Sequence, residues 1–214
     1  MFITTNWFQI FHPLKIYILI SLIIFLIKFK KKDETELQIV VILFLAVIHE
    51  SITSYFFYIQ KPISYITSIY ICINFILWIK LLIKVFHLKD MTILLIFYSS
   101  FVLINLLFFE GIESFNYNSF LLGTIIYVGL FAYQNYRLIK NENFELFKTK
   151  NYLYLTSPIL LFIGLSLMFA FKNKSLNSIE IFKNVSLYML ICYFVNFICY
   201  SLIILIKINN NKKT

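Results

Sequence analysis

Apolar residues fill most of this chain in seven long runs that are separated by short polar segments. A run of roughly 17–25 apolar residues is long enough for a helix to cross a hydrocarbon core about 30 Å thick. The pattern predicts membrane-spanning helices at about residues 10–29, 37–59, 63–85, 91–109, 118–138, 151–171 and 183–206. We therefore expect an all-α, polytopic membrane protein whose 214 residues form a single seven-helix domain.

Composition agrees with this pattern. Hydrophobic residues make up 61% of the chain and charged residues 14%, whereas roughly a quarter of an ordinary soluble domain is charged. The chain has only 4 Gly and 3 Pro, too few turn residues for many short elements. Its three cysteines lie in apolar runs without C-x-x-C spacing and suggest no metal or redox motif. Long helices are the expected elements.

Basic residues predict how the helices are oriented. Positive charge accumulates in the cytoplasmic loops of membrane proteins. One alternating set of connections holds 14 of the 19 Lys and Arg residues, and the other set holds 5. The richer set comprises Lys28, Lys30, Lys31, Lys32, Lys80, Lys84, Lys89, Arg137, Lys140, Lys148, Lys150, Lys207, Lys212 and Lys213; the poorer set comprises Lys15, Lys61, Lys172, Lys174 and Lys183. We expect the N-terminus outside and the C-terminus in the cytoplasm.

The same distribution of Lys and Arg residues explains the net charge of +9, so a nucleic-acid ligand is not needed to explain it. Basic residues spread over several loops serve orientation and contact anionic lipid headgroups. Nucleic acid is therefore not expected as a partner. For a cytoplasmic protein partner, the loop near 137–150 is the candidate contact, through Arg137, Lys140, Lys148 and Lys150.

Glu50 is an ionisable residue deep within an apolar run, and its presence there requires an explanation. An ionisable residue at mid-bilayer costs about 2.5–3.5 kcal/mol on insertion scales. Glu50 lies about 13 residues into its predicted span, roughly 20 Å from the cytoplasmic end. Thr53 and Ser54 share its helix face, and His49 is placed to reach Thr53. Either Glu50 is the ionisable centre of a ligand or proton site, or it is a protonated hydrogen-bonding group that holds helices together.

Polar groups in other spans are expected at a similar depth. Unsatisfied polar groups are costly in lipid, so these should turn inward and form a polar layer. The candidate ligand-binding core is His49, Glu50, Thr53, Ser54, Asn74, Ser100, Asn105 and Asn196. In the sixth span, Pro158 permits a kink, for which plain kinked-helix packing is favoured over a gate.

No motif indicates catalysis, a cofactor or a metal. The chain lacks G-x-S-x-G, and His49-Glu50 does not continue as H-E-x-x-H. The seventh span has lysines only at its ends, Lys183 and Lys207, so a retinal Schiff base has no central attachment point. His12 and His87 are expected near opposite membrane faces, which argues against a shared metal. We expect no enzyme activity.

Two stretches carry a resemblance. The segment "HESITSYFFYIQKPISYITSIYICINFILWIKLLIKVF", through Glu50, Tyr55, Tyr58, Tyr65, Tyr70 and Lys80, resembles a loose group of small stand-alone bacterial seven-helix membrane proteins. "YVGLFAYQNYRLIKNENF" is similar to the basic loop of that group. These proteins look like the seven-helix sensory modules of histidine kinases, which implies a bacterial inner-membrane location. Where the group has an acidic residue in the third helix, this chain has Asn74.

The resulting hypothesis is a non-enzymatic membrane receptor or signalling accessory that acts through a separate cytoplasmic protein. A small transporter or channel would suit the same polar layer and kink. A membrane effector or accessory of a defence system is a third hypothesis. The sequence leaves open whether the protein forms a homo-oligomer.

Overall fold

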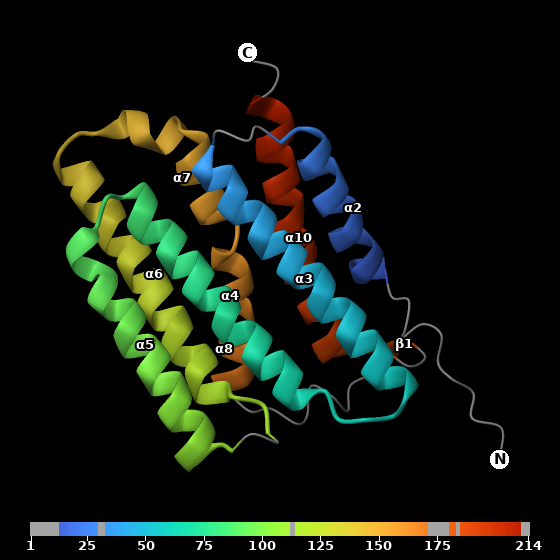
Figure 1. The fold of residues 1–214 in the computed structure, drawn as a ribbon. Helices are drawn as coiled ribbons and strands as arrows, with labels where there is room; N and C mark the ends of the chain where they lie inside the picture. The colour runs from blue at the N-terminus through green and yellow to red at the C-terminus, as the bar shows by residue number, and fades with distance from the viewer. Residues whose placement is uncertain (1–12, 30–32, 112–113, 171–179, 183–184, 211–214) are drawn as a thin grey trace, which may run out of the picture.

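A computed structural model describes residues 13–29, 33–111, 114–170, 180–182 and 185–210. This part of the chain is almost entirely helical (Figure 1). The α-helices are α2 (Pro13–Ile27), α3 (Glu34–Tyr58), α4 (Ser64–Val85), α5 (Thr92–Ile104), α6 (Tyr117–Lys140), α7 (Lys150–Thr156), α8 (Ile159–Ala170) and α10 (Leu187–Asn210). The shorter elements are the 3-10 helices η1 (Lys89–Met91) and η3 (Phe144–Lys148), the π-helix η2 (Asn105–Phe109), and the antiparallel strands β1 (Glu180–Phe182) and β2 (Val185–Ser186).

The helices overlap the seven predicted runs and extend past some of their ends, and the all-α class is confirmed. Among the described residues, five segments are long and apolar enough to cross a membrane by length and composition: Glu34–Tyr58, Ser64–Val85, Thr92–Phe109, Lys150–Phe169 and Leu187–Asn209. The apolar helix α2 has 15 described residues. The 24-residue α6 is more polar than these five segments and carries Asn118, Gln134 and Asn135. Predicted positions 10–12, 171 and 183–184 lie outside the described residues.

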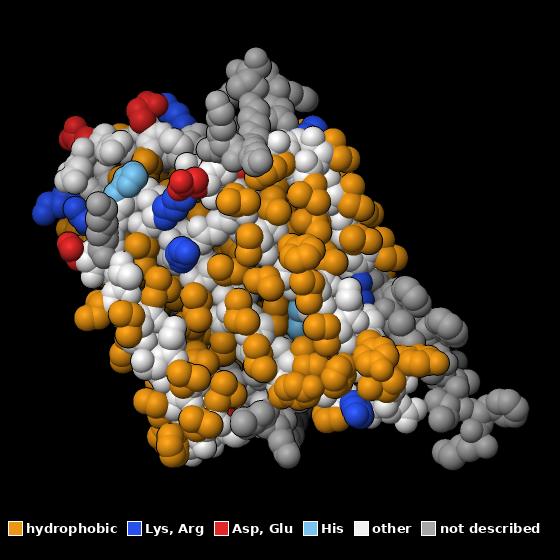
Figure 2. All heavy atoms as spheres, viewed as in Figure 1, with side chains coloured by type: hydrophobic (Ala, Val, Ile, Leu, Met, Phe, Trp, Pro, Cys, Tyr) orange, Lys and Arg blue, Asp and Glu red, His pale blue; other side chains and the backbone are white. Residues whose placement is uncertain are grey.

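The exterior of the bundle is apolar over its middle. Figure 2 shows one face on which hydrophobic side chains cover the central region, while most of the charged side chains gather toward one end. Ile93, Ile96 and Phe108 are 68%, 65% and 77% exposed. An exposed apolar surface of this extent is typical of a protein surrounded by lipid rather than water.

Consecutive long helices run antiparallel, so alternate connections lie at the same end of the bundle (Figure 1). One end carries the α2–α3 turn, the α4–α5 turn, the α6–α7 connection and the end of α10. We call it the basic end, since Lys28, Lys84, Lys148 and Lys207 lie there. The opposite end carries the α3–α4 turn, the α5–α6 loop and the β1–β2 pair. Helix α3 packs between α2 and α4, and α10 packs against α2, α7 and α8.

Local signals explain where helices begin and break. Asp33 caps α3 by accepting hydrogen bonds from the backbone N–H groups of Thr35 (2.9 Å) and Glu36 (3.2 Å). The helix therefore starts three residues before the predicted span. The expected kink in the sixth span is confirmed as a break, because α7 ends at Thr156 and α8 begins after Pro158. Proline has no backbone N–H with which to continue the helix.

Candidate ligand site at Glu50

Glu50 lies 16 residues after the start of α3 and eight residues before its end. At about 1.5 Å per residue, it is roughly 24 Å from the basic end of this helix and about 12 Å from the other end. The depth inferred from sequence, about 20 Å, is corrected because Asp33 starts the helix earlier. Glu50 is thus displaced from the middle of the bundle toward the opposite end.

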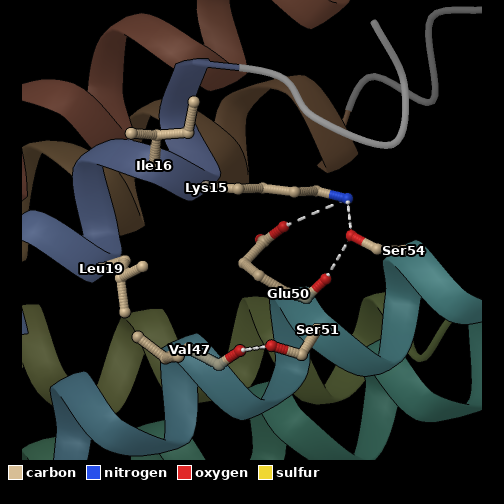
Figure 3. A pocket seen from close by; sticks show the side chains of 7 residues that line it. All are labelled: Lys15, Ile16, Leu19, Val47, Glu50, Ser51 and Ser54. Atoms are coloured by element: carbon tan, nitrogen blue, oxygen red, sulfur yellow. Dashed lines mark hydrogen bonds and ion pairs between the residues drawn. The ribbon is translucent and has the colours of Figure 1, made fainter. Parts of the chain in front are cut away.

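Lys15 is the ionic partner of Glu50, and sequence reasoning missed it. Its Nζ lies 3.8 Å from Glu50 Oε2 and donates a hydrogen bond to Ser54 Oγ at 2.7 Å (Figure 3). The hydroxyls of Ser54 and Thr53 donate to the backbone carbonyl of Glu50 at 2.7 and 3.1 Å. From the sequence, Lys15 contributes only to the orientation prediction. Lys15 lies 12 residues before the end of α2 and Glu50 lies 16 residues after the start of α3, so in an antiparallel pair their depths differ by about one helical turn, which a lysine side chain can bridge.

His49 faces α4. Its Nε2 lies 3.3 Å from Thr67 Oγ1, where the tautomer decides which atom donates, and its Nδ1 lies 3.7 Å from Glu50 Oε1. The imidazole stacks on the Tyr70 ring at a centroid distance of 4.1 Å. The hydroxyl that His49 contacts is therefore that of Thr67 on the neighbouring helix, rather than that of Thr53 as the sequence suggested. This arrangement fixes the ring beside Glu50.

Four of the predicted core residues line one cavity of about 140 Å³. They are His49 and Glu50 from α3, Asn74 from α4 and Asn196 from α10. Aromatic walls come from Tyr70, Phe75, Phe120, Phe162 and Tyr200, and aliphatic ones from Ile71, Leu161 and Leu165. A few convergent polar groups in an otherwise apolar cavity are typical of a small-molecule site.

The other predicted core residues lie elsewhere. Thr53 and Ser54 bond to the Glu50 carbonyl, and Ser54 faces Lys15. Ser100 is exposed on α5. Asn105 belongs to a separate cluster near the opposite end, where its amide donates to Glu110 Oε2 at 2.6 Å and to Ser119 Oγ at 3.2 Å. Sequence reasoning missed Glu110 because this residue immediately follows the predicted span 91–109 and therefore reads as a loop residue.

A second ionic cluster joins three helices at the basic end. Lys207 on α10 donates to Glu36 Oε2 at 2.5 Å, and the two side chains are 1% and 4% exposed. Lys150 on α7 lies 3.3 Å from Glu36 Oε1 and also pairs with Asp33. We call Asp33, Glu36, Lys150 and Lys207 the inner ionic cluster. Burial opposes ionisation of Asp33, but hydrogen bonds from Lys150 and from backbone N–H groups outweigh it and hold the pKa of Asp33 below its usual range.

The four predicted partner contacts fall into two groups. Arg137 and Lys140 are exposed at the end of α6, with the Arg137 guanidinium 6.0 Å from the Tyr133 ring centroid. Lys148 is exposed and pairs with Glu145 at 3.2 Å. Lys150 instead belongs to the inner ionic cluster, so its ammonium group bonds within the bundle. Arg137, Lys140 and Lys148 form the accessible part of the candidate contact.

Comparison with protein-family models, with curated proteins and with solved structures finds no match to this chain. Within the described ranges, no group of three or more His, Cys, Asp or Glu side chains is placed to hold a metal ion. The features of the described residues that bear on function are the Glu50 site, the inner ionic cluster and the apolar packing between them.

Proposed function

We propose that this protein is a non-enzymatic membrane receptor or signalling accessory. Its seven apolar segments cross a bacterial inner membrane, with the basic end in the cytoplasm as positive charge in short loops favours. A ligand binds at the Glu50 cavity, and a cytoplasmic protein binds at Arg137, Lys140 and Lys148. The resemblance to seven-helix sensory modules agrees with this role.

The packing along α3 is the observation that carries the proposal. Between Glu36 and Glu50, the inward face of α3 consists of Ile39, Ile42, Leu43 and Ala46, which are 0%, 2%, 0% and 1% exposed. A transport pathway needs polar groups or water along its length. Apolar packing between the cavity and the basic end instead suits a helix that transmits a movement without passing a solute.

Helix α3 also connects the two charged sites directly. It carries Glu50 near one end, and Asp33 and Glu36 at the other, where they contact α7 and α10. A shift of α3 caused by a ligand would change the inner ionic cluster. Close-packed interiors respond to such shifts by moving between discrete arrangements, which is the physical basis of a switch.

A small transporter is the second candidate, and the break at Pro158 favours it. Leu161, Phe162 and Leu165, just after the break, line the Glu50 cavity. Movement of α8 about the break would open the cavity as a gate. This alternative predicts solute or proton flux, which the receptor proposal does not.

Affinity capture tests the proposal when the parent chain is compared with variants at the proposed contact residues. The tagged full chain is isolated from its native membrane in mild detergent, and proteins that accompany it are quantified by mass spectrometry. The test variant is Arg137→Gln/Lys140→Gln, and the control is Lys61→Gln, which removes an exposed basic residue at the opposite end.

We expect a stoichiometric cytoplasmic protein that is lost from the double variant and retained by Lys61→Gln. Recovery of the chain alone would contradict the need for a partner. The next measurement would then be proton and solute flux in liposomes, where flux that Glu50→Gln abolishes would establish the transporter.

A further inference from the structure

A groove open to the surface of the bundle runs between α2 and α3 (Figure 3) and shares Glu50 with the cavity described above. Its volume is about 390 Å³, within the size range of small-molecule sites. Four of its lining side chains are polar and three are apolar. The lining residues are Lys15, Ile16, Leu19, Val47, Glu50, Ser51 and Ser54.

The polarity of the groove has a direction. On α2, Lys15 is near the start of the helix at the opposite end of the bundle, and Leu19 lies one turn deeper. On α3, Val47 lies deeper than Glu50, whereas Ser54 lies nearer that end. The groove is therefore polar toward the opposite end and apolar toward the middle.

A phospholipid of the outer leaflet has its polar and apolar parts in the same order, with the headgroup toward the outside and the acyl chains toward the middle of the bilayer. In the proposed orientation the opposite end faces outside, so a headgroup would lie near Lys15 while its acyl chain points toward mid-bilayer along Leu19 and Val47. Tyr55 and Tyr58, 60% and 63% exposed, follow on the same helix. Tyrosines of this kind are typical of the membrane interface. Glu50 is thus within about two turns of headgroup depth.

The charge pair defines which headgroup fits. Lys15 Nζ and Glu50 Oε2 lie 3.8 Å apart and present a positive and a negative charge side by side. A zwitterionic headgroup places its phosphate against Lys15 and its ammonium against Glu50, and the ammonium N–H groups donate to the carboxylate. A purely anionic headgroup meets the Glu50 carboxylate instead, which disfavours it.

We propose that this groove binds a phosphatidylethanolamine molecule from the outer leaflet, with its phosphate at Lys15, its ammonium at Glu50 and one acyl chain along Ile16, Leu19 and Val47. This inference rests on the proposed function, because it places a lipid against Glu50, the residue that the groove shares with the proposed ligand cavity. Because Glu50 lines both the groove and the cavity, a lipid in the groove would contact the carboxylate that the cavity also presents.

Native mass spectrometry of the lipid-depleted full chain measures this binding directly. The protein in detergent is titrated separately with phosphatidylethanolamine and with phosphatidylglycerol. The charge variants are Lys15→Gln and Glu50→Gln. Leu19→Trp fills the groove, and Ile20→Trp is its control, since Leu19 and Ile20 are similarly exposed (45% and 44%) but only Leu19 lines the groove.

We expect one phosphatidylethanolamine per chain, bound at least about tenfold more tightly than phosphatidylglycerol, a difference that one charge-assisted contact supplies. The affinity for phosphatidylethanolamine should fall by about tenfold in each of Lys15→Gln, Glu50→Gln and Leu19→Trp. It should not change in Ile20→Trp. Equal binding of both lipids, or binding that Leu19→Trp leaves unchanged, would overturn the inference. If the residue-specific partner capture still succeeds, the proposed function stands and only the ligand class is wrong.

Discussion

Lys207 and Glu36 form a buried ion pair whose members each depend on the other. The Lys207 ammonium also lies 4.9 Å from the Phe25 ring centroid, which adds a cation–π contact. A charge in such surroundings is stable only while its partner remains, since the cost of desolvating one ion is several kcal/mol. The Tyr154 hydroxyl is also buried and, among the described residues, has no hydrogen-bond partner. This end of the bundle is therefore sensitive to single changes.

We expect Lys207→Met to lower the free energy of unfolding by about 3–5 kcal/mol, because it leaves the Glu36 carboxylate buried without its principal partner. The double variant Glu36→Gln/Lys207→Met should lose less than the sum of the two single variants. Lys148→Met is the matched control, as Lys148 and Glu145 form an exposed pair (75% and 85%) worth roughly 0–1 kcal/mol. Equilibrium unfolding in detergent measures these values, and additive losses would contradict the pairing.

Acid should weaken the inner ionic cluster through Asp33. The pKa of Asp33 is lower in the folded chain than in the unfolded chain. Its contribution to the free energy of unfolding is therefore fully present above the ordinary carboxyl pKa of about 4, and it is lost as the pH falls through the folded-state pKa. Asp33→Asn retains an N-cap side chain but removes the charge. We expect this variant to be less stable by about 1 kcal/mol at neutral pH and to converge with the wild type in acid. Unfolding measured between about pH 3 and pH 7 tests this, and parallel curves would refute it.

At the scale of elements, α4 and α6 approach closely at Gly123. A Cβ atom built there would lie 2.8 Å from Cγ of Phe75. Phe75 has little room to move, because its ring stacks on Phe162 at 4.3 Å and meets Phe120 edge-on at 5.1 Å. Small residues permit such helix contacts in membranes. Phe75 also lines the Glu50 cavity, so this contact positions the candidate site.

Gly123→Ala should therefore destabilise the protein by about 1–3 kcal/mol, the usual cost of overpacking. Gly129→Ala is the control on the same helix, because no heavy atom lies within 4 Å of its built Cβ. Thermal unfolding in detergent compares the two variants. Equal melting temperatures for Gly123→Ala and Gly129→Ala would show that α4 and α6 do not pack as described.

Hydropathy and proline chemistry made most of the elements predictable. The helices occupy the expected runs, and the break at Pro158 follows from its missing N–H. Hydropathy did not predict the position of Lys15 against Glu50, or of Lys207 against Glu36, because it treats each lysine as a loop residue and contains no pairing information. One cavity is lined by His49, Glu50, Asn74 and Asn196, whereas Asn105 contacts Glu110 and Ser100 is exposed.

At the scale of the whole molecule, the bundle has a charged end and an apolar middle (Figure 2). The orientation proposed here predicts which loops are accessible from outside. In intact cells, a membrane-impermeant maleimide should label Lys61→Cys at the α3–α4 turn, and Asn141→Cys at the basic end only after lysis. The parent chain provides the background, as Cys72 and Cys199 are buried. The reverse labelling pattern would invert the topology.

The central claim is that the state of Glu50 is transmitted along α3 to a partner at the basic end. Photocrosslinking in living cells tests it most directly, with a photoreactive amino acid at position 140 and, as control, at position 61. The account predicts one defined cytoplasmic adduct from position 140 and none from position 61. It also predicts that Glu50→Gln changes the adduct yield, whereas Ile52→Ala, at an exposed position that lines neither the cavity nor the groove, does not. An adduct whose yield is the same with Glu and Gln at position 50, or no adduct from position 140, would contradict the account.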